Sequence, residues 1–178
     1  FGLVGLLVGT TSCLGLDEDG AGSGGAPVTP AEPACSITQA DDYTIGGPLT
    51  WDGAADVETM TLGSGSFYAL IGDAGTTNTF EIEVGLPMGF IPLVTPLPYY
   101  TSLTAVSLGS VLPGEFAAEA NDLNPPNPSS VEASTGSTAH VWIKMCPTNL
   151  VQLTVDVDME DSSGQTYHVT FTGAVAAP

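Results

Sequence analysis

The sequence predicts an all-β fold, an antiparallel β-sandwich of the immunoglobulin-like or jelly-roll kind with about seven to nine strands. Three observations support this prediction. Short strand-type apolar runs, separated by Gly, Pro, Asn and Asp, recur through residues 35–178. Hydrophobic residues make up 43% of the chain, which is enough to fill a core. The connections are hairpin-like, without a long helical crossover, so neighbouring strands should be largely antiparallel.

The clearest strands lie in two hairpins. Residues 151–159 alternate apolar and polar side chains, the period of two that a half-buried strand requires. A turn over 160–164 leads to a return strand over 166–172, whose polar positions should face solvent. Residues 66–71 and 79–84 show the same pattern and predict a second hairpin.

The rest of the chain gives weaker signals. Four prolines in residues 87–100 predict an edge strand or an extended loop, because proline cannot donate a ladder hydrogen bond. Residues 119–138 are expected to form a long loop, and Glu115–Ala120 is the one short helix candidate. The remaining strand candidates are residues 43–51, 57–62, 101–108 and 139–146.

The charge balance is extreme. The chain has 20 acidic residues and one basic residue, Lys144, so its formal net charge is -19. We therefore expect no nucleic-acid binding, because no Lys or Arg cluster exists to contact phosphate. The ordinary interpretation of such acidity is a solvated surface that stays soluble by self-repulsion.

The N-terminus is apolar and uncharged. Residues 1–8 form a hydrophobic run too short for a membrane-spanning helix but of the length found in a secretory signal. Small polar residues then lead to Cys13. A complete secretory signal has an initiating Met and a basic segment before the hydrophobic run, and this sequence has neither. We therefore expect that the sequence is truncated at its N-terminus.

The small residue Ser12 followed by Cys13 resembles the signal of bacterial lipoproteins, although Thr10 stands where that family usually has Leu. The resemblance implies cleavage before Cys13, acylation of its thiol and attachment to a membrane. Residues 1–13 would be the signal, 14–34 a flexible Gly/Ser/Pro/acidic linker, and 35–178 the β-sandwich domain. The alternatives are a plain cleaved secretion signal and a buried N-terminal strand.

Export sets the interpretation of location and of the remaining cysteines. If Cys13 is acylated, the resemblance implies that Leu14, in place of the Asp associated with inner-membrane retention, favours the outer membrane or cell surface. A periplasmic or secreted location is the alternative. An oxidising compartment permits Cys35 and Cys146 to pair. Val141 and Ile143 occupy one face of their predicted strand and Cys146 the other, so the bridge should hold the N-terminal arm across the outside of a sheet.

Two groups of residues are candidate ligand sites. Asp156, Asp158, Glu160 and Asp161 cluster at the tip of the C-terminal hairpin and offer hard oxygen ligands for calcium, although the order of an EF-hand is missing. The alternative is a set of solvated carboxylates. No other cofactor is indicated.

Tyr99 and Tyr100 end the proline-rich run and are candidates for stacking on a sugar or a protein partner. Adjacent strand residues point to opposite faces, so only one of the two can be displayed. The competing interpretation places this run in the core.

No catalytic set emerges from the sequence. His140 and His168 each fall on the polar face of a predicted strand, and two histidines alone make a poor catalytic site. We therefore expect a non-catalytic cell-surface or envelope lipoprotein module for adhesion, structure or partner binding, rather than an enzyme. The alternative is a carbohydrate- or small-ligand-binding β-sandwich, assisted by calcium.

Overall fold

The structure of the chain is a computed structural model. It describes residues 30–49, 56–72, 79–91, 94–109, 111–121 and 130–177. The chain divides into two units, Phe1–Ala31 and Glu32–Pro178, and all ten described strands belong to the second. The predicted signal, Cys13 and most of the predicted linker lie outside the described residues.

The predicted all-β class is confirmed. The described residues contain ten strands and no helix, slightly more strands than the seven to nine expected. Among the described residues there is therefore no helix that is long and apolar enough to cross a membrane. The strands are β1 (Tyr43–Gly46), β2 (Asp56–Gly63), β3 (Ser66–Gly72), β4 (Thr79–Gly85), β5 (Tyr99–Ala105), β6 (Glu115–Asn121), β7 (Ser130–Ala133), β8 (Thr138–Cys146), β9 (Leu150–Asp161) and β10 (Thr166–Ala176).

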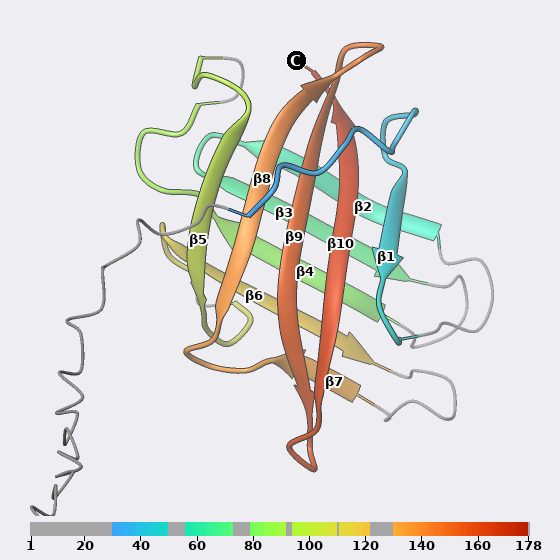
Figure 1. Cartoon of the computed structure of the whole chain (residues 1–178), viewed down its shortest axis with the longest axis vertical. Helices are drawn as coiled ribbons and strands as arrows, with labels where there is room; N and C mark the ends of the chain where they lie inside the picture. The colour runs from blue at the N-terminus through green and yellow to red at the C-terminus, as the bar shows by residue number, and fades with distance from the viewer. Residues whose placement is uncertain are drawn as a thin grey trace, which may run out of the picture. The chain divides into compact units, whose positions relative to one another are not determined.

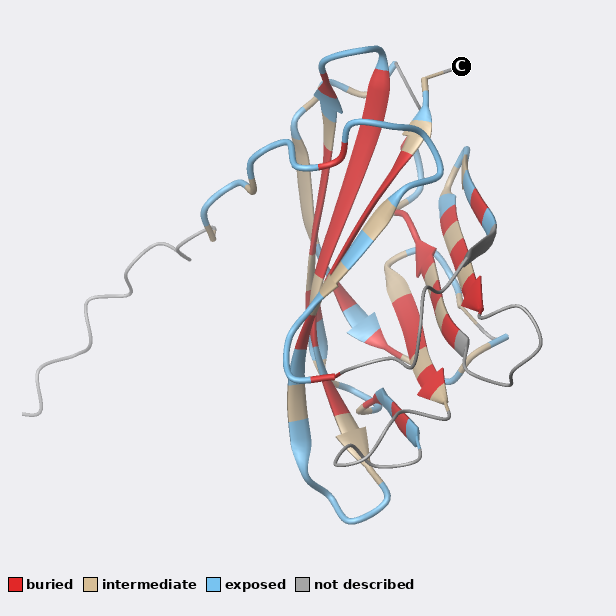
Figure 2. Ribbon diagram, turned by 90° about the vertical axis from the view of Figure 1, so that its right-hand side faces the viewer, coloured by how far each residue is buried: buried red, intermediate tan, exposed pale blue. Residues whose placement is uncertain are grey.

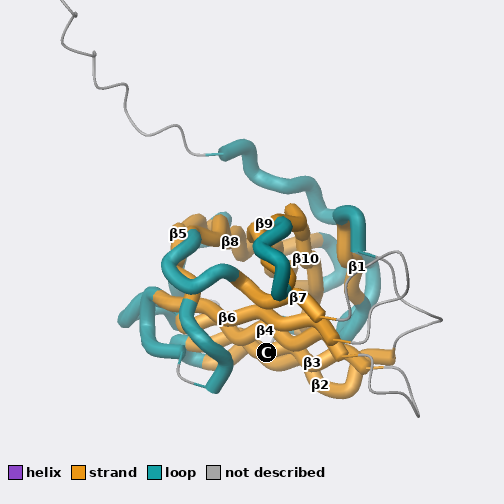
Figure 3. Tube along the Cα trace, turned by 90° about the horizontal axis from the view of Figure 1, so that it is seen from below, coloured by secondary structure: helices purple, strands orange, loops and turns teal. Residues whose placement is uncertain are grey.

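The strands form one continuous hydrogen-bonded sheet folded into two layers. Its order is β1-β10-β9-β8-β5-β6-β4-β3-β2, and β7 pairs with both β6 and β9. Every described pairing is antiparallel except that of β5 with β6. One layer holds β5, β8, β9, β10 and β1, and it crosses the layer of β2, β3, β4 and β6 (Figures 1 and 3). This arrangement is sandwich-like, as predicted.

The core fills the space between the two layers. Phe171 of β10 is completely buried, and its ring centroid lies 5.5 Å from that of Phe80 and 6.1 Å from that of Phe67. Because β10 belongs to one layer while Phe67 and Phe80 belong to the other, this aromatic contact joins them. Figure 2 shows buried residues along the strands of both layers.

The C-terminal hairpin forms as predicted, with longer strands than expected, and its turn is closed by a carboxylate. Thr172, which was expected to face solvent, is buried instead. Asp161 Oδ1 accepts hydrogen bonds from Ser163 N at 2.8 Å and Gln165 N at 3.0 Å, while Oδ2 accepts one from the Tyr167 hydroxyl at 3.0 Å. The Ser163 hydroxyl also donates to Oδ1. These bonds, chiefly the one from the Ser163 side chain, lower the pKa of Asp161 to about 2. Gly164 adopts a positive φ of 84° in the turn.

Two predictions about local structure are wrong. The helix expected over Glu115–Ala120 is strand β6, and the long loop expected over 119–138 contains the end of β6 and all of β7. Residues 117, 118 and 120 are alanines, which favour helices. All three are buried, and pairing with β4 and β7 overrides that local preference.

The strand expected over residues 43–51 is shorter than predicted. Strand β1 ends at Gly46, and residues 50–55 lie outside the described part. Gly47 then has a φ of 124°, and a side chain at this position would collide with the carbonyl of His168. The chain thus leaves β10 at a point that only glycine permits.

Candidate functional site

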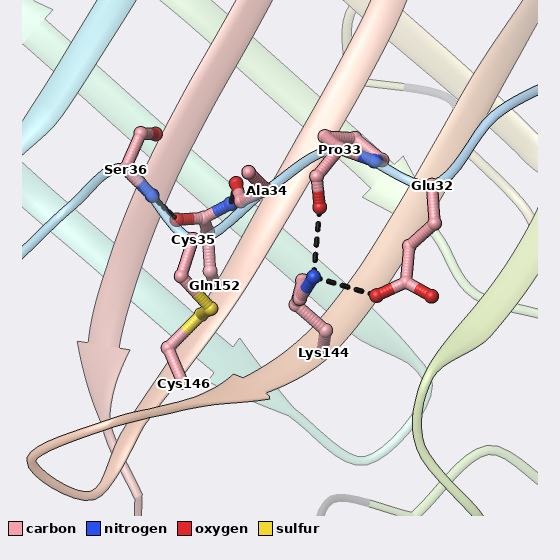
Figure 4. Close-up of polar contacts among 8 residues, drawn as sticks. All are labelled: Glu32, Pro33, Ala34, Cys35, Ser36, Lys144, Cys146 and Gln152. Atoms are coloured by element: carbon pink, nitrogen blue, oxygen red, sulfur yellow. Dashed lines mark hydrogen bonds and ion pairs between the residues drawn. A yellow bond between two sulfur atoms is a disulfide. The ribbon is translucent and has the colours of Figure 1, made fainter.

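The N-terminal arm, whose contacts with the sheet involve residues 32–37, lies across the outer face of β8, β9 and β10 (Figure 1). Cys35 and Cys146 form a disulfide with a Cα–Cα separation of 5.8 Å (Figure 4). Ile37, Cys146, Leu150 and Ala174 make a small apolar cluster separate from the main core. The bridge therefore holds the arm outside the sheet rather than between its layers, as the alternation along β8 predicted.

Gln152 of β9 is the second attachment of the arm. Its Oε1 accepts a hydrogen bond from Ser36 N at 2.9 Å, and its Nε2 donates to Ala34 O at 3.0 Å (Figure 4). The same Oε1 also accepts a hydrogen bond from Ile37 N at 3.3 Å. Gln152 is only 1% exposed, although the sequence pattern placed it on the solvent face. One buried amide thus satisfies three backbone groups of the arm.

Lys144 of β8 is the third attachment. Its Nζ lies 2.6 Å from Glu32 Oε1 and donates to Pro33 O at 2.8 Å (Figure 4). Lys144 is the only lysine or arginine in the chain. Glu32 thus contacts the sheet although it lies within the range 14–34 that the sequence predicted as linker.

A second feature of the outer face is an aromatic cluster on β5 and β8. The Tyr100 ring centroid lies 5.3 Å from that of Trp142, and the Tyr100 hydroxyl is 2.8 Å from His140 Nδ1. Tyr99 points the other way and packs on Phe90, with ring centroids 5.3 Å apart. The two tyrosines therefore lie on opposite faces, and Tyr100 is the one on the outer face.

Beside this cluster lies a shallow polar depression of about 280 Å³. It is lined by Thr138, His140, Asp156, Val157, Asp158 and His168. His140 is directly opposite Asp156 across β8 and β9, while His168 is opposite Asp158 across β9 and β10. The sequence identified both histidines as outward strand residues, but only the register shows that they flank the same two aspartates.

His168 connects the two aspartates. Its Nδ1 lies 2.8 Å from Asp158 Oδ1 and its Nε2 lies 2.9 Å from Asp156 Oδ1. Both ring nitrogens can donate a proton only when the imidazole is charged. The hydrogen bond to Asp158, followed by the charges of both carboxylates, raises the pKa of His168 above its ordinary value.

This arrangement predicts a pH-dependent contribution to stability. Because the pKa of His168 is higher in the folded state, its protonated ring stabilises the fold fully at a pH below the ordinary pKa near 6.5. This stabilisation disappears as the pH rises through the raised pKa of the folded state. Thermal unfolding at pH 5.5 and 8.5 should show His168→Gln costing more at the lower pH. The difference should be at most about 1 kcal/mol, because the His168 side chain is 64% exposed. An equal cost at both pH values would contradict the prediction.

The structure separates the predicted calcium ligands into three environments. Asp156 and Asp158 contact His168, Asp161 closes the hairpin turn, and Glu160 Oε2 accepts a hydrogen bond from the Ser134 hydroxyl at 2.7 Å. Among the described residues, no group of three or more His, Cys, Asp or Glu side chains is arranged to hold a metal ion. Calcium binding stays a prediction, which a thermal scan in millimolar Ca²⁺ with and without EGTA would check.

Glu160 instead belongs to a row of four glutamates that the sequence did not reveal. Glu81 of β4 pairs with Glu119 of β6, Glu119 with Glu132 of β7, and Glu132 with Glu160 of β9. These residues, the glutamate row, face outward beside a depression of about 200 Å³. Carboxylates directly opposite one another on neighbouring strands repel.

Neutralising the middle of the glutamate row should therefore stabilise the fold. Glu132→Gln is expected to raise the free energy of unfolding by roughly 0.2–1 kcal/mol at low salt. The gain should shrink at high salt, because exposed charges are screened. Urea unfolding at two salt concentrations measures it. Glu83→Gln is the matched control, since Glu83 lies opposite Tyr68 and Ala117 rather than another carboxylate.

No protein-family model, curated protein or solved structure matches the chain. The described part of the outer face offers an arm attached at three points, an aromatic cluster and a polar depression.

Proposed function

We propose that this chain is a non-catalytic, exported lipoprotein module of the bacterial cell envelope, anchored through Cys13 and displayed on residues 14–31. The observation that carries the proposal is the Cys35–Cys146 disulfide on the outer face. Such bridges form and persist in oxidising compartments outside the cytoplasm. A Gly/Ser/Pro/acidic segment between Cys13 and Glu32 has the composition of a spacer.

The arm suits a domain that is held from its N-terminal side. Cys146 and Lys144 lie on β8, and Gln152 lies on the adjacent strand β9. Both strands have hydrogen-bonded neighbours on either side, so the arm is attached in the interior of the layer rather than at an edge. Tension on the N-terminal segment would be carried by these strands without peeling an edge strand from the sheet.

Metabolic labelling tests the anchor directly. In cells of the native host, an alkyne analogue of palmitate should label the wild-type protein, and Cys13→Ser should abolish the label. Non-reducing mass spectrometry of the same protein should find Cys35 joined to Cys146. Absence of label on the wild-type protein would contradict lipidation, and free thiols at both positions would contradict export to an oxidising compartment.

A second candidate function is binding of a carbohydrate or another small polar ligand at the outer face. It is favoured by the aromatic ring of Tyr100 beside a depression lined by two aspartates and two histidines. Aromatic faces stack on sugar rings, and carboxylates accept hydrogen bonds from hydroxyl groups. A glycan array probed with the wild-type protein and with Tyr100→Leu tests this candidate. Binding that survives the substitution unchanged would count against it.

A further inference from the structure

One part of this acidic chain carries no charge. Residues 84–114 contain no Asp, Glu, Lys, Arg or His, whereas the whole chain has 20 acidic residues. Four of the five large apolar side chains exposed in the described part of the chain belong to this segment. They are Met88 at 90% exposure, Val94 at 72%, Leu112 at 62% and Ile91 at 46%.

These four residues, here called the apolar rim, belong to the β4–β5 and β5–β6 connections. Phe90 is buried against Tyr99, and Phe90 N donates to Pro87 O at 3.1 Å. The next turn is closed by Ile91 N, which donates to Thr95 Oγ1 at 2.9 Å. Among the described residues of this connection, Phe90, Ile91 and Val94 are thus held by local hydrogen bonds.

The β5–β6 connection packs against the start of the β4–β5 connection. Gly114 N donates to Gly85 O at 2.8 Å, and a side chain at Gly85 would collide with the Leu112 carbonyl. Leu112 thus lies beside the residue that opens the connection bearing Met88.

The β4–β5 connection ends close to the place where the N-terminal arm meets the sheet. It leads into Tyr99, which is directly opposite Ile143 of β8. The next residue of β8, Lys144, binds Glu32 at the start of the arm. Met145, the fifth exposed large apolar side chain in the described part, follows immediately at 41% exposure. The chain that follows an N-terminal anchor therefore first contacts the described domain near the end of β8, beside the β4–β5 connection.

We propose that the apolar rim rests on the surface of an uncharged lipid bilayer when the chain is anchored through Cys13, an inference that rests on the proposed function. Contact with the bilayer removes the exposed apolar side chains from water. A net charge of -19 opposes approach to anionic headgroups, so the favoured surface is zwitterionic. Anchoring raises the effective concentration of the rim at the bilayer, so a small patch suffices.

Met88 serves as a built-in reporter for this contact. Cys13 is the one cysteine outside the disulfide, so the oxidised full-length chain can be coupled through it to maleimide-bearing lipid in phosphatidylcholine–phosphatidylethanolamine vesicles. Peroxide oxidation of Met88, followed by mass spectrometry, should be roughly threefold slower than in the free chain, because methionine oxidation follows exposure. Buried Met159 should stay unoxidised in both samples, which confirms that the fold is intact.

The matched control anchors the same domain from elsewhere. The variant Cys13→Ser/Ser162→Cys couples through the β9–β10 turn, at the opposite end of β9 from Gln152, and should leave Met88 oxidation as fast as in the free chain. Val94→Asp, coupled through Cys13, should also restore fast oxidation, and a third of phosphatidylglycerol in the vesicles should weaken the protection.

Equal oxidation of Met88 in the Cys13-coupled and Ser162→Cys-coupled samples would overturn the inference. Chemical coupling replaces the natural anchor, so this result is independent of the metabolic labelling. Failure of the labelling would refute lipidation, whereas failure of the protection would refute the orientation of the domain.

Discussion

Removing the Cys35–Cys146 disulfide is expected to lower the free energy of unfolding by about 2–5 kcal/mol. The bridge joins residues 111 positions apart, so it restricts a large part of the unfolded chain. In the folded state it keeps Ile37 packed on Leu150 and Ala174 at the outer face. Urea unfolding of the wild-type protein and of Cys35→Ser/Cys146→Ser measures the loss.

Cys13→Ser is the control for the loss of a thiol as such, and it should leave the unfolding midpoint unchanged. Adding a reductant to the wild-type protein should reproduce the behaviour of the double variant. A midpoint that is the same with and without the bridge would show that the arm contributes nothing to the stability of the domain.

Gln152→Leu is expected to cost about 2–3 kcal/mol, because a leucine of similar size leaves three backbone groups of the arm without their partner. These groups are Ser36 N, Ile37 N and Ala34 O. Amide hydrogen exchange should report the detachment as faster exchange at Ser36 and Ile37. Unchanged protection of these two amides would contradict the role assigned to Gln152.

Thr154→Val is the matched control for Gln152→Leu. Thr154 is the next buried polar residue on the outer face of β9, and its hydroxyl lies 3.3 Å from that of Thr172. Its loss should cost less and should leave exchange at Ser36 and Ile37 unaffected. In the disulfide-free background, Gln152→Leu should be non-additive, because both attachments hold the same segment.

Alternation of side chains determined much of the fold. It located both strands of the C-terminal hairpin, placed Tyr99 and Tyr100 on opposite faces, and assigned Cys146 to the face opposite Val141 and Ile143. The structure confirms each of these because a strand has a strict period of two, so every residue in a correctly identified strand has a determined face.

The partners of those faces were decided by the tertiary structure alone. Every residue from Leu150 to Val155 of β9 is buried, although alternation predicted a half-buried strand. The arm, held by its disulfide, packs on the outer face of this strand. A local sequence pattern cannot predict such burial, because the covering segment is distant in sequence. Strand β6 was missed for a related reason, since pairing partners, not its alanines, decide its conformation.

The sequence by itself determined the all-β class, and it identified the cysteine pair and the outward direction of Cys146. Only the tertiary structure brought His140 and His168 to the same aspartates, aligned the glutamate row, and placed the amide of Gln152 under the arm. The physical reason is register: a local pattern specifies which face a side chain occupies, but the residue opposite depends on how distant strands align.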